Sequence, residues 1–251
     1  MPWADPKVWA GGLRRAGAAL LDLIYPQNCT ACGVQMDVAG RACLCPACES
    51  TLPRIGEWQC PRCADELGPY SHGRRACGSC RDREGLMFVA ASSVFRYEMV
   101  AREMVHRLKY GRDLRSVDWM GAEMFHSAQA REWYGKVDMV APVPLHWRRR
   151  VSRRFNQSEM LAHVVARAGG LPCLPRALVR LRPTHPQADL TFAERWRNLQ
   201  GAFGVRRVER IKGRVPLLVD DVMTTCATAA ECSRVLLDAG AKAVYVLTFA
   251  R

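Results

Sequence analysis

Hydrophobic residues gather in four runs that predict the strands of one sheet. The clearest run, residues 215–219, has no polar residue and no alternation, as expected of a central parallel strand buried on both faces. Residues 137–143, apolar except for Asp138, also indicate a buried strand, and residues 86–95 and 243–249 are further predicted strands. The pattern therefore predicts a sheet with buried central strands.

Between these runs, apolar residues recur at helical spacing. Residues 97–110 place Val100, Met104 and Leu108 on one face, and residues 114–133 form a second predicted helix. Asn156 and Glu159 are suited to begin a third helix. Alternating strands and helices predict an α/β domain over residues 86–251, with a parallel sheet and right-handed crossovers.

The strand at 215–219 ends in two adjacent carboxylates, Asp220 and Asp221. The carboxyl edge of a parallel sheet is where open α/β folds bind ligands. Thr228 followed by Glu231 fits a capping box, which predicts a helix over residues 228–238 that ends near Gly240.

The segment between the carboxylates and this helix is suited to hold a phosphate. A helix start presents unpaired N–H groups and partial positive charge, to which threonine hydroxyls add further donors. Carboxylates repel phosphate but accept hydrogen bonds from vicinal hydroxyls, so a ribose 5′-phosphate fits both halves of the motif. The alternative is a buried strand followed by a polar turn. The candidate ligands are Asp220, Asp221, Thr224, Thr225, Cys226, Ala227 and Thr228.

Four consecutive C-x-x-C pairs occupy residues 28–84, a spacing that suits tetrahedral thiolate zinc sites. The simplest grouping is sequential, and an interleaved grouping stays open, as does a competing role for Cys43. An iron-sulfur cluster or a disulfide framework is the alternative. The predicted ligands of up to two structural Zn²⁺ ions are Cys29, Cys32, Cys45 and Cys48, and Cys60, Cys63, Cys77 and Cys80.

Charge separates the two parts of the chain. The net charge is +13, and residues 1–85 contribute only 10 basic and 9 acidic side chains to it. The basicity therefore belongs to the C-terminal domain, while two four-thiolate zinc sites would leave the N-terminal module mildly acidic. A protein partner or a structural role suits such a module better than phosphate-backbone binding.

No apolar run reaches the about 18 residues that a membrane-spanning helix needs. Residues 1–27 are expected to form an amphipathic lead-in helix rather than a signal peptide, because Asp22 interrupts their apolar stretch. The sequence thus predicts a cytoplasmic protein.

Two basic segments add candidate ligands for a pyrophosphate group. An arginine-rich run follows the strand at 137–143, at the same edge of the sheet as Asp220, and guanidinium groups bind phosphates bidentately. The polar connection at residues 181–198 is long enough to act as a lid. The arginines concerned in the first segment include Arg150, Arg153 and Arg154.

Residues 217–231 resemble the 5-phosphoribosyl-1-pyrophosphate (PRPP) signature of type I phosphoribosyltransferases. The chain as a whole is similar to the ComF family, the ComFC/GntX-like competence proteins with a phosphoribosyltransferase-like domain and an N-terminal double zinc ribbon. Supporting motifs are Leu108-Lys109-Tyr110, residues 141–146, Arg154-Phe155-Asn156-Gln157, Thr184 with Gln187 and Leu190, Arg195 with Asn198, and Gly240-Ala241.

This resemblance implies that PRPP binds with Mg²⁺ and that Asp220 and Asp221 hold the ribose hydroxyls. It implies that residues 141–146, with Pro144 and His146, form the pyrophosphate loop, and that Arg182 and Gln187 belong to the flexible loop that closes over the site. It also implies a link to DNA uptake, with single-stranded DNA and competence proteins as possible partners. Acceptor and oligomeric state have no readable signal.

Two departures from the family pattern concern the proposed site. Cys226 stands where the phosphate loop usually has glycine, and Arg154 replaces the glycine of an Arg-Gly-Phe-Asn-Gln motif. A non-glycine residue held in a left-handed conformation costs about 1–2 kcal/mol, so Cys226 is expected to weaken PRPP binding, and its thiol is a candidate for oxidation. Two alternatives to an enzyme therefore stay open: a non-catalytic phosphate or DNA-binding competence factor, and a zinc scaffold for a partner protein.

Overall fold

A computed structural model describes most of the chain and contains the predicted parallel sheet. The described residues are 28–36, 42–56, 59–68, 77, 80, 86–111, 113–145, 155–184 and 192–251. The lead-in helix expected at 1–27 and the domain boundary near residue 85 lie outside these ranges.

Four parallel strands form the main sheet, in the order β1-β6-β5-β2. Strand β5 is central and fully apolar up to Val219, whereas β1 and β2 form the sheet margins. The bounds are β1 Ala90–Phe95, β2 Met139–Pro142, β5 Pro216–Val222 and β6 Tyr245–Ala250. The α/β class predicted from the sequence is confirmed.

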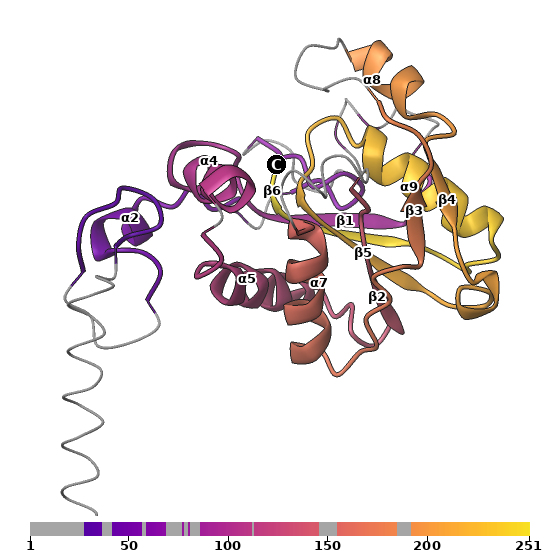
Figure 1. The fold of residues 1–251 in the computed structure, drawn as a ribbon, viewed down its shortest axis with the longest axis horizontal. Helices are drawn as coiled ribbons and strands as arrows, with labels where there is room; N and C mark the ends of the chain where they lie inside the picture. The colour runs from indigo at the N-terminus through magenta and orange to yellow at the C-terminus, as the bar shows by residue number, and fades with distance from the viewer. Residues whose placement is uncertain are drawn as a thin grey trace, which may run out of the picture.

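Helices cover both faces of this sheet (Figure 1). Helix α9 lies on one face, and α5 and α7 lie side by side on the other. Successive residues of β5 alternate between the two resulting cores, with Leu218 packed on the α9 side and Leu217 and Val219 on the α5/α7 side. The bounds are α4 Met99–His106, α5 Val117–Ala130, α7 Gln157–Ala168 and α9 Ala227–Asp238.

Two short antiparallel strands lie beside the main sheet and flank the connection that the sequence predicts to be a loop. Strand β3, Leu178–Arg180, pairs with β4, Phe203–Val205. Between them lies helix α8, Phe192–Leu199, so the expectation of an irregular lid over residues 181–198 is wrong for its second half. Trp196 and Leu199 lie one turn apart and pack against the α9 core, which supplies the burial that stabilises this helix.

Two element boundaries near the acidic pair differ from prediction. Strand β5 continues to Val222, so Asp220 and Asp221 lie inside the strand rather than after it. Helix α9 begins at Ala227 with Cys226 as its N-cap, and the expected capping box does not form. Glu231 instead accepts a hydrogen bond from the Gly201 amide (2.7 Å) and pairs with Arg234, partners that sequence spacing does not reveal.

Helix α4 ends in a turn of π-helix, η1, Arg107–Gly111. The sequence predicts one continuous α-helix here, starting two residues earlier. The cap expected at Asn156 is confirmed, because its side chain accepts from the Ser158 amide.

The N-terminal cysteine module attaches to the margin of the sheet. The backbone of Ile55 donates to Val94 of β1 (3.0 Å), and that of Arg96 donates to Pro53 (2.8 Å). The module also contains the short helix α2, Pro46–Ser50. Within the described residues, no helix reaches the length and hydrophobicity that crossing a bilayer requires.

Candidate functional site

The acidic pair is divided between the two faces of β5. Adjacent residues of a strand point in opposite directions, and the two carboxylates accordingly have different partners. Asp220 lines a cavity under the start of α9, whereas Asp221 is 6% exposed and pairs with a lysine from η1. The two carboxylates therefore lie in different surroundings, and only Asp220 lines the cavity.

Asp220 is held in place by hydrogen bonds to one of its oxygens. Oδ1 accepts from the Ser158 hydroxyl at the start of α7 (2.7 Å) and from the Asp221 amide (2.9 Å). Burial, followed by the neighbouring charge of Asp221, raises the pKa of Asp220 to about 7. The carboxyl group is thus poised to change protonation near neutral pH.

Asp221 forms an ion pair with Lys109, whose Nζ lies 2.9 Å from its Oδ1. Burial favours the neutral amine, but the charge and hydrogen bond of Asp221, together with the charge of Asp220, outweigh burial and raise the pKa of Lys109. The lysine therefore stays charged and neutralises a buried carboxylate directly beside the candidate site.

The predicted phosphate segment forms one wall of the cavity that Asp220 lines. This cavity gathers most of the residues predicted from the motif: Asp220, Thr224, Thr225, Cys226, Ala227 and Thr228. The first turn of α9 forms part of this wall, and the start of a helix directs backbone N–H groups out of the helix. The cavity is small, with a volume of about 30 Å³, and Thr224 at its border is exposed.

Cys226 occupies the strained position that the sequence predicts. Its φ is +64°, in the left-handed region where glycine is favoured, and the side chain is 2% exposed. Its sulfur accepts a hydrogen bond from Nη1 of Arg251 (3.2 Å). This contact anchors the segment in its strained conformation.

Arg251 connects this segment to the cysteine module. Its Nε donates to Asp65 (3.3 Å), two residues after Cys63. The guanidinium is nearly buried, with 8% of the side chain exposed. One side chain thus bridges the second cysteine cluster and the start of α9.

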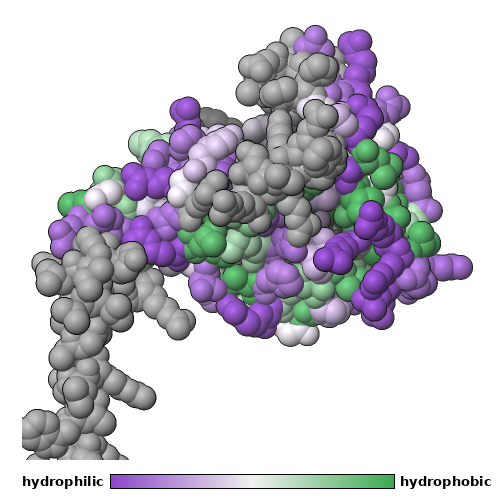
Figure 2. All heavy atoms as spheres, in the orientation of Figure 1, coloured by the Kyte–Doolittle hydropathy of each residue, from purple (hydrophilic) through white to green (hydrophobic). Residues whose placement is uncertain are grey.

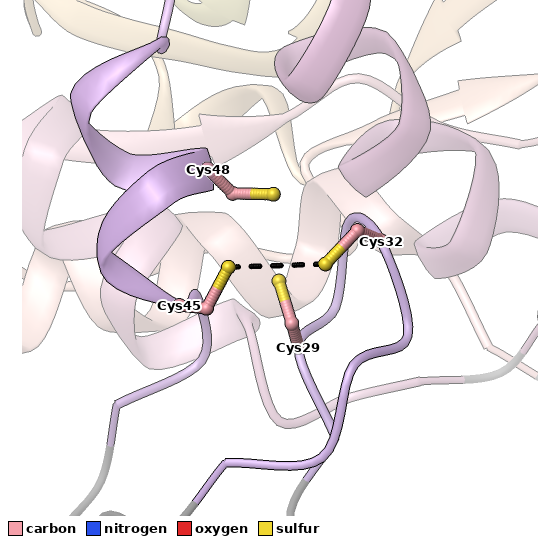
Figure 3. A group of neighbouring side chains, drawn as sticks. All are labelled: Cys29, Cys32, Cys45 and Cys48. Carbon is pink, nitrogen blue, oxygen red and sulfur yellow. Dashed lines mark hydrogen bonds between the residues drawn. The ribbon is translucent and has the colours of Figure 1, made fainter.

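The first cysteine cluster consists of Cys29, Cys32, Cys45 and Cys48, whose sulfurs converge on one point (Figure 3). The sulfurs of Cys32 and Cys45 are 3.8 Å apart. Zn–S bonds of about 2.3 Å in a tetrahedron place sulfurs about 3.8 Å apart, so the cluster fits a structural zinc ion.

The second cluster, Cys60, Cys63, Cys77 and Cys80, is fully buried and equally compact. The sulfurs of Cys60 and Cys80 are 3.4 Å apart, and those of Cys63 and Cys77 are 3.5 Å apart. The sequential grouping of the eight cysteines is therefore the one that the structure contains. Cys43 belongs to neither cluster, and burial raises the pKa of its thiol to about 12, which opposes metal binding.

Other predicted ligands lie elsewhere or outside the described residues. Pro144 borders a separate hollow beside β3. Arg182 donates to the carbonyl oxygens of Asn198 (3.1 Å) and Gln200 (2.7 Å). Its guanidinium therefore pairs with backbone carbonyls at the C-terminal end of α8 and does not line the cavity. Outside the described residues are His146, Arg150, Arg153, Arg154 and Gln187.

Three residues at the site had no role assigned from the sequence. Lys109 was visible only as part of a short motif, and the pairing that brings it to Asp221 spans more than one hundred positions. Ser158 and Arg251 carry no local signal, because their partners lie on other elements.

Replacing Asp220 with asparagine is expected to remove a pH dependence of stability. Because the pKa of Asp220 is raised from 3.8 to about 7 on folding, the folded state binds this proton more tightly than the unfolded state. The resulting stability is fully present below about pH 4 and is lost as the pH rises through about 7. Denaturant unfolding should show a loss of up to about 1.4 kcal/mol per pH unit from this group. Identical pH profiles for wild type and D220N would contradict the burial argument.

Comparison with known proteins agrees with this architecture. Residues 20–81 match the family model of the double zinc ribbon domain. The chain is 31% identical to the DNA utilization protein YhgH of Escherichia coli over 234 residues, covering 91% of this chain and 99% of that protein. It is 27% identical to competence protein F of Haemophilus influenzae over 230 residues (89% and 96% covered). Identity to competence protein ComFC of Bacillus subtilis is 28% over 211 residues (82% of each).

The fold and the two clusters define an α/β protein that combines a parallel sheet with a double zinc ribbon. The chain belongs to the ComF family, to which the similarity to YhgH, competence protein F and ComFC assigns it.

Proposed function

We propose that the protein binds PRPP at the carboxyl edge of the sheet, as a phosphoribosyltransferase-like member of the ComF type. The observation that carries this proposal is the single cavity in which Asp220 faces the start of α9 and its threonines. A carboxylate and a cluster of amide and hydroxyl donors complement the two ends of a ribose 5′-phosphate.

In this proposal Asp220 accepts hydrogen bonds from the ribose hydroxyls, and the helix start with Thr224, Thr225 and Thr228 binds the 5′-phosphate. Lys109 keeps Asp221 neutralised, so the negative charge close to the ligand stays low. Mg²⁺ would arrive with PRPP, since neither carboxylate belongs to a metal-binding cluster among the described residues. Bound there, it would neutralise charge on the departing pyrophosphate.

Isothermal titration with PRPP and Mg²⁺ tests the proposal. The D220A variant should lose measurable binding, because the ribose hydroxyls lose their acceptor, and its zinc content should stay unchanged. Asp238 provides a matched control, since it is exposed at the far end of α9, and D238N should bind as the wild type does. Equal PRPP affinity in D220A and wild type would reject the site.

Transfer of the phosphoribosyl group is a separate question from binding. We infer that the left-handed Cys226 limits turnover, because glycine would adopt this conformation without strain. Pyrophosphate release across a panel of bases, amines and oligonucleotides should be faster for C226G than for wild type. A variant no faster than wild type would show that the cysteine does not limit the reaction.

The names of the relatives, DNA utilization protein and competence protein, support a link to the handling of DNA. The second candidate is accordingly a non-catalytic competence factor that binds phosphates or single-stranded DNA and uses the zinc module as a partner scaffold. Its support is the +13 net charge, most of it outside the zinc module. DNA binding that excess PRPP does not displace would favour this candidate, and a partner complex lost on zinc chelation would favour the scaffold role.

A further inference from the structure

The two cysteine clusters differ in their exposure to solvent. All four cysteines of the second cluster are buried, and none of them is more than 9% exposed. In the first cluster, by contrast, Cys32 is exposed and Cys48 is half-buried. The chain has twelve cysteines, all of which the structure describes, and Cys32 is the only exposed one. A dissolved reagent therefore reaches the first cluster more readily than the second.

Local structure explains why the first cluster is open on one side. The turn that carries Cys32 continues into exposed residues, of which Val34 is 52% exposed, and Cys48 lies on α2, a helix with no buried residue. Hydrophilic and hydrophobic side chains lie next to one another on the surface where Figure 1 places α2 (Figure 2). The second cluster instead belongs to the same core as Leu86 and Phe88.

Cysteine oxidation selects thiols that are both ionised and exposed. Zinc binds cysteine as the thiolate, so Cys32 has both properties. The free cysteines lack at least one of them. Cys43 and Cys226 are only 5% and 2% exposed, and burial raises the pKa of the half-buried Cys173 to about 11, which keeps its thiol protonated at neutral pH. The burial of Cys226 therefore opposes the oxidation that its sequence position suggests.

We propose that Cys32 is the site at which a hydroperoxide oxidises this protein, and that its oxidation releases the zinc ion of the first cluster. The Cys32 thiolate attacks one oxygen of the hydroperoxide, so that an S–O bond forms as the O–O bond breaks. The leaving alkoxide or hydroxide takes up a proton. The sulfur is thereby oxidised to a sulfenic acid, and the hydroperoxide is reduced to an alcohol or water. The inference does not depend on PRPP binding.

A second thiolate of the same cluster completes the reaction. The sulfur of Cys45 lies 3.8 Å from that of Cys32 (Figure 3). It attacks the sulfenic acid, so that an S–S bond forms and the S–O bond breaks, and the leaving hydroxide takes up a proton to become water. The zinc ion then dissociates, because two of its four ligands are joined in a disulfide. A thiol reductant and added zinc restore the cluster.

The second cluster keeps its zinc ion during this reaction. Its cysteines are buried, and the neighbouring hydrogen bond from Arg251 to Asp65 (3.3 Å) stays in place. Oxidation therefore changes the outer part of the zinc module without disturbing the start of α9.

Hydrogen peroxide, added to the full, zinc-loaded chain together with a chromogenic zinc chelator, tests the proposal. One equivalent of zinc should be released at least about tenfold faster than the second equivalent. Digestion and mass spectrometry at that point should find a disulfide between Cys32 and Cys45. The four cysteines of the second cluster should still be available for alkylation after denaturation.

The variant C32H removes the exposed thiolate and keeps a zinc ligand, since zinc also binds three cysteines and one histidine. It should bind two zinc ions, and peroxide should release the first of them at least about tenfold more slowly than in wild type. Cys43 provides the matched control, because it is a free thiol in the core against which the first cluster packs. The release rate of C43S should stay within about twofold of wild type.

Three results would overturn the proposal. The first is release of both zinc ions at the same rate, and the second is release of one ion while Cys32 remains unmodified. The third is a C32H variant that binds two ions and loses the first as fast as the wild type does. If C32H binds only one ion, the mass spectrum of the oxidised wild type decides alone.

Discussion

Replacement of Lys109 by methionine is expected to lower the free energy of unfolding by about 3–5 kcal/mol. The variant leaves the carboxylate of Asp221 buried and without its counter-charge at 2.9 Å. Chemical denaturation monitored by circular dichroism measures the loss. A change below about 1 kcal/mol, the value typical of surface pairs, would show that the pair is solvated.

The double variant K109M/D221L separates stability from ligand binding. Replacing both partners of a buried pair with apolar side chains is often neutral, so most of the lost stability should return. PRPP binding then shows whether Asp221 also contacts the ribose. If the double variant binds PRPP as tightly as the wild type does, Asp220 alone acts on the ligand. A folded double variant without affinity would assign Asp221 to the ribose as well.

Disrupting the second zinc cluster should weaken PRPP binding as well as remove zinc. In C63S the bound zinc is expected to fall from two ions to one, and the turn that carries Asp65 loses its anchor. Asp65 holds Arg251, and Arg251 holds Cys226, so the start of α9 should become less ordered. We expect the binding free energy for PRPP to fall by roughly 1.4 kcal/mol, the size of one hydrogen bond. This corresponds to an affinity about tenfold weaker.

C32S is the matched control for this effect. Cys32 is an exposed ligand of the first cluster, which packs against the opposite core, so its loss should also release one zinc ion. PRPP affinity should stay within about threefold of wild type. Equal effects of C32S and C63S on affinity would show that zinc acts through global stability and not through Arg251. Zinc is measured by mass spectrometry, and affinity by calorimetry.

The sequence was sufficient for the parts of the fold that periodicity encodes. Apolar runs located β2 and the first part of β5, up to Val219, because a parallel strand covered on both faces is rich in apolar residues. C-x-x-C spacing located both clusters because two sulfurs of one turn can reach one ion.

Features that depend on distant partners could not be predicted. Helix α8 is stabilised by Trp196 and Leu199 packing on the α9 core, and its short polar segment carries no such information. Sequence spacing placed Asp220 and Asp221 together as one pair, but the strand continues through them and separates their side chains. The capping box failed for the same reason, since Glu231 has closer partners in Gly201 and Arg234.

The attachment of the zinc module along β1 has a consequence for the metal-free chain. An uncovered marginal strand presents a row of free amides and carbonyls and recruits other chains into intermolecular sheets. In this protein the segment at Pro53 and Ile55 hydrogen-bonds the Val94 carbonyl of β1 and the Arg96 amide directly after it, and it lies in the sequence between the two cysteine clusters. Loss of zinc is therefore expected to uncover this end of β1 and to favour pairing with other chains, which light scattering of the chelator-treated protein would detect.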